Sequence, residues 1–299
     1  MPAIPLTIYL AAASRNSATV TGMFGTLLAV FGSACEETAN SIGKYEIQKR
    51  TASIYTFGFL ALLFGTTFLL VEGFVRHNLF FSLASLPTFL PRVALEILQA
   101  YVTVRAITIS DRGDFGLVKT LTIPLLLLID IALSYTVAPL QIVGMALIVS
   151  PIAFLLYVER RQIKGLRYLL IGAVNAAITI SLYKYDISHF NSVEAEQSLI
   201  GIALMVYFFI FAYIKAGENP LRFLRKRAFA AQATASGLAN VAVSFAYFFA
   251  PASIILATLR SSAVLLAILT GRLYFRERHF LIRITLFVFV LVGLILLIL

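Results

Sequence analysis

The sequence predicts an all-α membrane protein with ten transmembrane helices, arranged as two inverted five-helix repeats. Ten strongly apolar stretches fill the 299 residues, and a helix of about 20 apolar residues is long enough to cross a bilayer. Hydrophobic residues make up 60% of the chain and charged residues 13%, whereas a soluble domain carries about 25% charged residues. The stretches form two sets of five, so a second half with the fold of the first must enter the membrane upside down.

The expected helices begin and end at transitions in polarity and at helix breakers. Ala138-Pro139, Pro220 and Ala250-Pro251 mark three turns, because proline cannot continue a helix without losing a backbone hydrogen bond. Open β structure is excluded in lipid, where each unpaired backbone group costs several kcal/mol. The expected spans are residues 20–43, 52–75, 86–110, 114–134, 138–157, 167–186, 195–215, 227–249, 251–271 and 280–299.

These spans divide the chain into three parts. Residues 1–19 are expected to form an N-terminal interfacial segment, residues 20–157 the first five-helix repeat and residues 158–299 the second. The N-terminal segment has a short apolar run from Leu6 to Ala13 without basic residues before it, so it lacks the charged leader of a signal peptide. The repeat is inferred from the number and spacing of the spans, since the two halves share little sequence.

Basic residues are distributed unequally between the two sides of this arrangement. The loops after spans one, three, five, seven and nine, with the adjoining span ends, carry 17 basic residues; the opposite side carries only Arg15, Arg76 and Lys184. Lys and Arg in short loops remain in the cytoplasm. We therefore expect a multi-pass protein of the cytoplasmic (inner) membrane with both termini outside.

Several classes of function are excluded by composition. The single cysteine, Cys35, rules out an intramolecular disulfide framework and a cysteine-built metal site. The three histidines lie at loops or span ends without metal-ligand spacing, and no Gly-x4-Gly-Lys-Ser/Thr nucleotide loop occurs. The net charge of +10 is explained by topology rather than by nucleic acid. We expect no catalytic site, metal or cofactor and no nucleic-acid partner.

Ionisable and amide side chains inside the spans are the candidates for a binding site, because such groups are costly in lipid and normally face an interior or an aqueous cavity. Glu36 and Glu37 are adjacent on the first span and point about 100° apart, so one could line a cavity while the other forms an assembly ion pair. The expected cavity residues are Glu36, Glu37, Asn40, Arg92, Glu96, Lys119, Asn175, Tyr183, Gln232, Asn240 and Arg260.

Four of these candidates have a competing structural interpretation. Arg92 and Glu96 are four residues apart and can pair within one helix. Arg260 lies near the middle of the ninth span and has no acid in its own helix. Its planar guanidinium suits a carboxylate or phosphate, but an acid from another span could neutralise it instead. Amide groups such as that of Gln232 also form hydrogen bonds between helices.

The last fifty residues carry a more specific pattern, Pro251-Ala252-Ser253, Leu259-Arg260-Ser261-Ser262, Gly271, Phe275, Glu277 and Gly293. This resembles the C-terminal signature of EamA-like members of the drug/metabolite transporter superfamily. A fainter copy in the first half consists of Asp114-Phe115-Gly116, Pro124 and Gly144, and it departs from the pattern at Ala138-Pro139, where family halves often have Gly-Glu. The resemblance implies ten spans, transport and cytoplasmic termini; for the termini we follow the charge distribution. Glu277 itself is expected to cap the helix that follows it.

The expected function is secondary transport, more specifically export, of a small polar or amphipathic metabolite by alternating access, driven by protons or by the substrate gradient. Its partners would be the substrate and membrane lipids, and the protein would be a monomer or homodimer. A lipid or lipid-linked substrate translocase and a non-transporting scaffold subunit are the alternatives. An embedded enzyme would need a nucleophile–base pair or a metal cluster, which the sequence does not offer.

Overall fold

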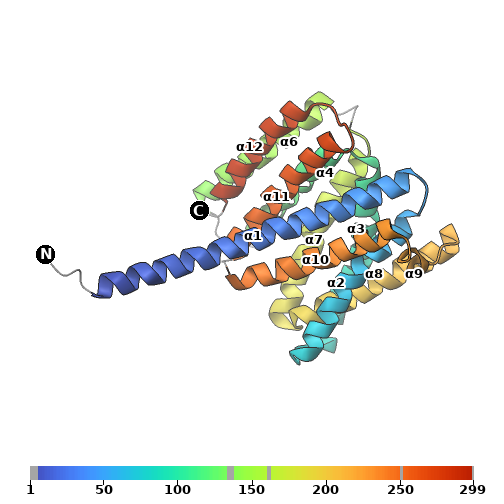
Figure 1. The fold of residues 1–299 in the computed structure, drawn as a ribbon, viewed down its shortest axis with the longest axis horizontal. Helices are drawn as coiled ribbons and strands as arrows, with labels where there is room; N and C mark the ends of the chain where they lie inside the picture. The colour runs from blue at the N-terminus through green and yellow to red at the C-terminus, as the bar shows by residue number, and fades with distance from the viewer. Residues whose placement is uncertain (1–5, 133–137, 160–162, 250–251, 298–299) are drawn as a thin grey trace.

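A computed structural model describes the backbone of residues 6–132, 138–159, 163–249 and 252–297, with side chains from residue 23 onwards apart from 130, 158–159 and 252–253. The described chain is helical, as predicted (Figure 1). Its helices are α1 (Leu6–Gln48), α2 (Ile54–Val75), the 3-10 turn η1 (Leu83–Ser85), α3 (Leu86–Ile109), α4 (Arg112–Lys119), α5 (Thr122–Ala132), α6 (Pro139–Glu159), α7 (Leu166–His189), α8 (Val193–Ala216), α9 (Pro220–Phe223), α10 (Arg227–Phe249), α11 (Ala252–Leu273) and α12 (Phe280–Leu296).

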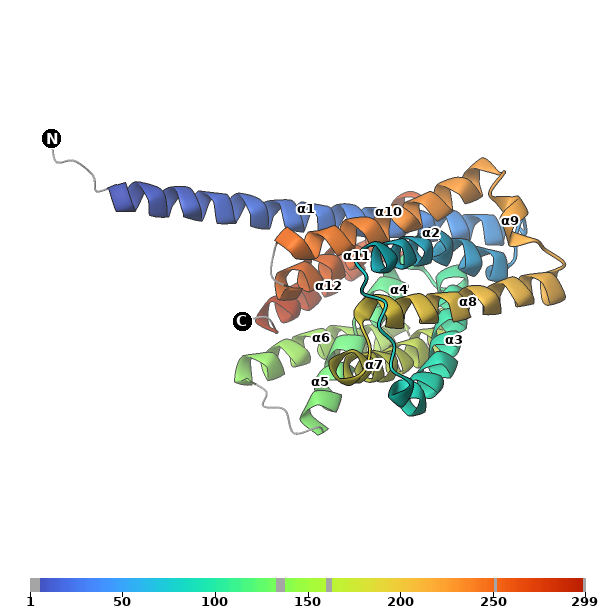
Figure 2. The ribbon, with the colours of Figure 1, turned by 90° about the horizontal axis from the view of Figure 1, so that it is seen from below.

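Most predicted span boundaries lie within a few residues of these helices, and the first helix differs most. The prediction separated residues 1–19 from a span at 20–43, but α1 is one helix of 43 residues. Figures 1 and 2 show its N-terminal part extending beyond the neighbouring helices. The predicted break at Ala250-Pro251 lies outside the described residues.

The predicted fourth span, 114–134, is two helices rather than one. Pro124 has no N–H and cannot bond the Thr120 carbonyl four residues earlier. That carbonyl accepts the Ile123 N–H instead, at 3.0 Å. The chain therefore tightens at Thr120–Leu121, so α4 ends at Lys119 and α5 starts at Thr122. Pro124 could have signalled this break in the sequence.

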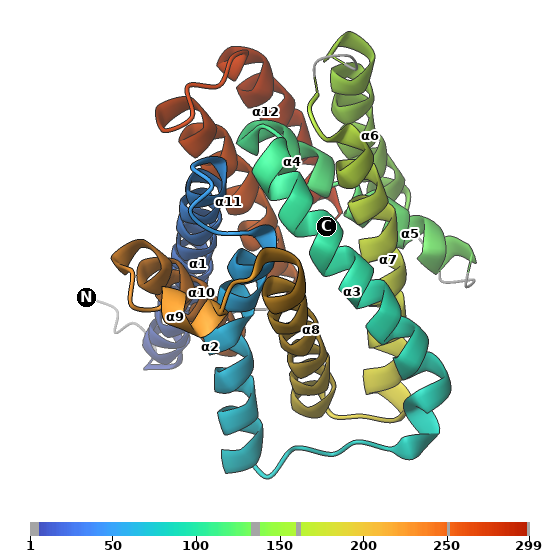
Figure 3. The same cartoon turned by 90° about the vertical axis from the view of Figure 1, so that its right-hand side faces the viewer.

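Helices far apart in the sequence pack in pairs. α1 packs on α10 and α11, α2 on α8 and α10, α3 on α7, α4 on α11 and α6 on α12. Figure 3 shows α2 beside α8 and α6 beside α12. The last pair crosses at two glycines: a Cβ on Gly144 would lie 2.7 Å from the Gly293 carbonyl oxygen, and a Cβ on Gly293 would lie 2.7 Å from that of Gly144.

The loops gather at two ends of the bundle, as an alternating up-and-down path requires. At one end Glu218 accepts hydrogen bonds from the Ser53 N–H and hydroxyl, at 3.0 and 2.7 Å, and Lys44 donates to the Ser110 carbonyl at 2.6 Å. We call this the basic end; it comprises residues 49–53, 110–111, 163–165, 217–226 and 274–279. At the other end the Phe80 and Ser192 backbones join the α2–α3 and α7–α8 connections at 2.9 Å.

Five of the described helices are long and apolar enough to cross a membrane by length and composition, in the ranges Ile54–Val75, Pro139–Tyr157, Leu166–His189, Val193–Ala216 and Ile254–Leu273. Phe280–Leu296 is a shorter apolar helix. Large apolar side chains such as Phe74 and Leu281 are exposed on the outside. The chain is thus a helical protein with several apolar spans.

Candidate functional site

A cavity of about 530 Å³ lies at the centre of the bundle, between helices of both halves of the sequence. Helices α1 to α4 line it from the first half, and α8, α10 and α11 from the second. Its wall combines apolar side chains with polar ones. The ionisable and amide side chains that line it are Glu36, Glu37, Asn40, Glu96, Gln99, Arg112, Lys119, Asn240 and Arg260.

A second cavity of about 250 Å³ adjoins the first beside α7. The two share Glu96, Gln99, Thr103, Phe115, Lys119 and Arg260 in their linings. Lys119 and Arg260 therefore face the space where the two cavities meet.

Seven of the eleven candidate residues line the larger cavity, namely Glu36, Glu37, Asn40, Glu96, Lys119, Asn240 and Arg260. The other four, Arg92, Asn175, Tyr183 and Gln232, are absent from the walls of both cavities. Asn175 joins α7 to α3, donating to the Leu95 carbonyl and to Gln99 at 2.9 Å each. Gln232 is fully buried and donates to the Phe57 carbonyl at 3.2 Å, the interhelical role that the sequence left open.

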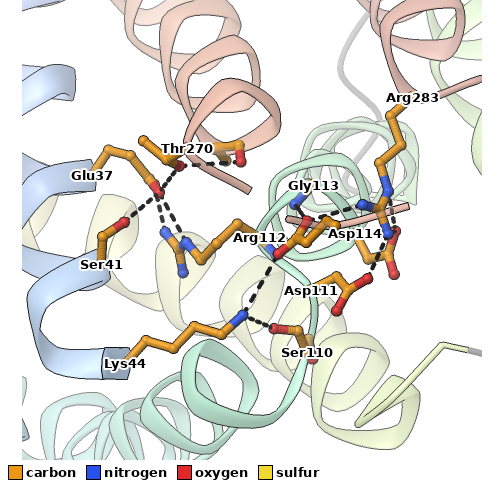
Figure 4. A network of polar contacts seen from close by, with 12 residues as sticks. Glu37, Ser41, Lys44, Ser110, Asp111, Arg112, Gly113, Asp114, Thr270 and Arg283 are labelled. Atoms are coloured by element: carbon orange, nitrogen blue, oxygen red, sulfur yellow. Dashed lines mark hydrogen bonds and ion pairs between the residues drawn. The ribbon is translucent and has the colours of Figure 1, made fainter. Parts of the chain in front are cut away.

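Glu37 is held in a saturated ion pair at one wall of the cavity. The Arg112 guanidinium binds its carboxylate with two nitrogens, with Nε 2.9 Å from Oε1. Thr270 of α11 and Ser41 also donate to Oε1, at 2.6 and 3.1 Å. Figure 4 shows this carboxylate reaching from α1 to groups of α4 and α11.

Glu277 organises a cluster next to this pair, and it caps a different helix from the predicted one. Its carboxylate accepts the N–H groups of Arg112 and Gly113, at 2.5 and 3.2 Å, and so caps the N-terminus of α4. A carboxylate there satisfies unpaired donors and complements the helix dipole. Gly271 leaves room for it, because a Cβ at this position would lie 2.3 Å from Oε2 of Glu277.

Arg283 of α12 completes the cluster at the basic end. It donates to Glu277, Asp111 and Asp114 at 2.9 Å each, while Lys44 lies 3.7 Å from Glu277 (Figure 4). The cluster ties α1, α4, α11 and α12 together. The sequence indicated Arg112 and Arg283 only as topology determinants, not as members of a cluster. The one sequence feature that pointed to this cluster was the motif that contains Gly271 and Glu277.

A separate ion-pair group joins α3 to α8 and α7. The predicted pair of Arg92 and Glu96 is present at 3.7 Å, but a closer partner of Arg92 is Glu196 of α8. The Arg92 guanidinium also lies over the Tyr183 ring, 4.6 Å from its centre. Asn191 donates to the second oxygen of Glu196 at 2.5 Å, so this group fixes the end of the bundle opposite the basic end.

Glu36, Lys119 and Arg260 are held far more loosely. The Lys119 ammonium lies 3.8 Å from a Glu36 oxygen, and both side chains are about half exposed, 44% and 54%. Glu36 also attracts Arg260 electrostatically. These groups can therefore exchange partners with a molecule that enters the cavity.

No protein-family model matches this sequence, and no curated protein matches it. Among the described residues, no group of three or more His, Cys, Asp or Glu side chains is placed to hold a metal ion.

Proposed function

We propose that the protein is a secondary transporter that carries a small polar metabolite through the central cavity by alternating access. The observation that supports this most directly is a cavity lined by ionisable side chains, at the contact between the two halves of a bundle with apolar spans. Its volume of about 530 Å³ falls within the range of about 300–1,000 Å³ that is typical of small-molecule sites. Transporter sites commonly lie between two repeats.

Helix pairing supports the finer proposal of two inverted five-helix repeats. Exchanging α1, α2, α3, α4–α5 and α6 with α7, α8, α10, α11 and α12, in that order, maps the largest helix contacts onto one another. The pair α1·α10 becomes α7·α3, α1·α11 becomes α7 with α4–α5, and α2·α10 becomes α8·α3, whereas α2·α8, α4·α11 and α6·α12 map onto themselves. The reciprocal contact of Gly144 and Gly293 is what a two-fold axis through the α6·α12 crossing would produce.

Sidedness follows from the charges. We propose that the basic end faces the cytoplasm, since it gathers the loops that hold most of the loop Lys and Arg residues. Both termini then lie outside. Similarity to EamA-like transporters in the last fifty residues agrees with the proposed class, although that family usually has cytoplasmic termini.

The two ion-pair groups then act as gates. Glu37, Arg112 and the Glu277 cluster hold α1, α4, α11 and α12 together at the basic end. Arg92 and Glu196 hold α3 to α8 at the other end. Because the cavity lies between these groups, breaking one while keeping the other would open it to one side at a time.

Thiol accessibility tests alternating access without knowledge of the substrate. Ser236 of α10 lines the cavity, so S236C in a C35A background reports its exposure. We expect a membrane-impermeant maleimide to label S236C when added to either face of sealed vesicles. Labelling from one face only, or from neither, would contradict the proposal; S192C in the same background, on a connection at the end opposite the basic end, is the control for one-sided labelling.

A further inference from the structure

We propose that the central cavity binds a small organic anion, a soluble metabolite with a carboxylate or phosphate group, between Lys119 and Arg260, and that Glu36 is the resident counter-ion which this anion displaces. The proposal names the substrate class of the transport cavity and in that respect rests on the proposed function. Binding is nevertheless measurable apart from transport.

Arg260 differs from the other arginines of the interior in lacking a direct partner. Arg92, Arg112 and Arg283 each donate to at least one carboxylate. For Arg260 the described part of the chain provides neither a hydrogen bond nor an ion pair within 4 Å, and its electrostatic interactions are with Glu36 and Tyr247 without direct contact. Its side chain lines both cavities. A guanidinium presents five N–H donors that suit a carboxylate or phosphate.

Lys119 offers the second cation at the same place. Its distance of 3.8 Å from Glu36 exceeds the 2.7–3.2 Å of a hydrogen bond, so the two groups attract each other without a direct bond. Lys119 belongs to α4 in the first half, whereas Arg260 belongs to α11 in the second. An anion between them would bridge the halves.

The placement of charge around Lys119 and Arg260 favours an anion over a cation at this point of the cavity. Three acids and three bases line the larger cavity, namely Glu36, Glu37, Glu96, Arg112, Lys119 and Arg260. Glu37 and Arg112 neutralise each other in a bidentate pair, and Glu96 faces Arg92. Arg92 is also paired with Glu196, so these charges balance as a set. Among the described residues, however, Lys119 is ion-paired with Glu36 only, and Arg260 with no carboxylate. Two cations that share one acid are costly in an interior of low dielectric constant, and an anion bound between them relieves this local imbalance.

A cationic ligand lacks a matching partner in this cavity. Every acid in the lining already has a basic neighbour: Arg112 for Glu37, Arg92 for Glu96, and Lys119 for Glu36. An incoming cation would have to compete with both Lys119 and Arg260 for Glu36, or break the closer pair of Glu37 with Arg112. An incoming anion only has to compete with the loosely held Glu36 carboxylate.

Ligand-induced stabilisation of the purified full-length protein in phosphatidylcholine nanodiscs provides the test. The probes are lactate and glycerol 3-phosphate, each matched with a neutral analogue, lactamide and glycerol, and choline is the cationic control. We expect at least one anion to raise the melting temperature and no neutral or cationic probe to do so. At about 100 times the dissociation constant, a ligand stabilises by about 2.7 kcal/mol.

Three variants and a control assign the effect to the site. K119Q and R260Q should each weaken anion binding at least tenfold, because each removes one of the two cations. E36Q should strengthen it several-fold, because it removes the competing carboxylate. R225Q removes an exposed arginine at the basic end and should leave the dissociation constant unchanged, which controls for a general effect of positive charge.

The proposal is overturned if neither anion binds at millimolar concentration, if the neutral analogues bind equally well, or if K119Q and R260Q bind like the wild-type protein. It is also overturned if only phosphatidylglycerol in the nanodisc stabilises the protein, since the anion would then be a lipid headgroup. Two-sided labelling of S236C without anion binding would refute the substrate class while leaving transport intact. Anion binding with one-sided labelling would refute transport instead.

Discussion

Replacing Glu37 by Gln should open the basic end of the cavity. In the Glu37–Arg112 pair only 6% and 1% of the two side chains is exposed, and the glutamate also accepts from Thr270 and Ser41. Removing one partner of a buried pair costs about 3–5 kcal/mol, because a charge is left uncompensated. At about 1.4 kcal/mol for each factor of ten, the lower bound shifts the closed-to-open ratio by about 100-fold.

The labelling rate of S236C measures this shift directly. In the E37Q variant, we expect an impermeant maleimide added at the basic end to react up to about 100-fold faster, until the open state dominates. E36Q is the matched control, because it removes a neighbouring carboxylate from a loose, half-exposed pair and should leave the rate almost unchanged. The double variant E37Q/R112Q should be opened less than E37Q, since no unpaired charge remains.

An E37Q protein that melts near the wild-type temperature but is labelled at the wild-type rate would refute this reasoning. The pair would then be a fixed support rather than a gate. Equal acceleration in E37Q and E36Q would also refute it, since a general loss of negative charge on α1 would explain both.

Three further predictions follow from the packing and the topology. G144A and G293A should each destabilise the protein by about 1–3 kcal/mol, as measured by thermal unfolding, because the added methyl group forces α6 and α12 apart. G172A is the control and should have a small effect, since its Cβ would meet nothing closer than 3.5 Å. Equal losses of stability in all three variants would contradict the packing. E277A should strongly lower the melting temperature, because it uncaps α4, removes the ion-pair partner of Lys44 and takes away one of the three carboxylates that Arg283 contacts; a wild-type melt would show the cluster to be dispensable. Epitope tags at either terminus should be reached by antibody on intact cells, and protection of both would reverse the proposed sidedness.

Local sequence pattern was enough to predict the helices, because the hydrophobic stretches and the breakers act over a few residues. The helical class and most boundaries were confirmed on this basis. The start of α1 was missed because residues 6–19 are of mixed polarity, and hydropathy does not register a helix that continues through them. The break before Pro124 was missed because the span was predicted from its mean hydropathy, which does not register the backbone hydrogen bond that Pro124 removes.

The site depended on contacts that sequence distance conceals. Glu36 and Glu37 both line the cavity; Glu37 is in the buried pair and Glu36 in the loose one, a difference that the sequence could not predict. Glu37 is in the buried pair because Arg112, 75 residues away in the sequence, donates to it. The prediction had placed Arg112 in a loop. Arg92 likewise has a neighbour in its own helix and a closer partner 104 residues away.

The contrast between saturated and loose charges is what lets one bundle both hold a conformation and respond to a ligand. Glu37 and Glu277 already accept hydrogen bonds from protein donors, so a ligand gains little by binding to them. They therefore stabilise the closed basic end whether the cavity is occupied or empty. Lys119 and Arg260 retain free donor capacity on opposite halves. A ligand shifts a conformational equilibrium only by its differential affinity for the two states. An anion that bridges α4 and α11 has such a differential affinity. It can contact Lys119 and Arg260 together only while the two halves keep the relative position that places these side chains on either side of it.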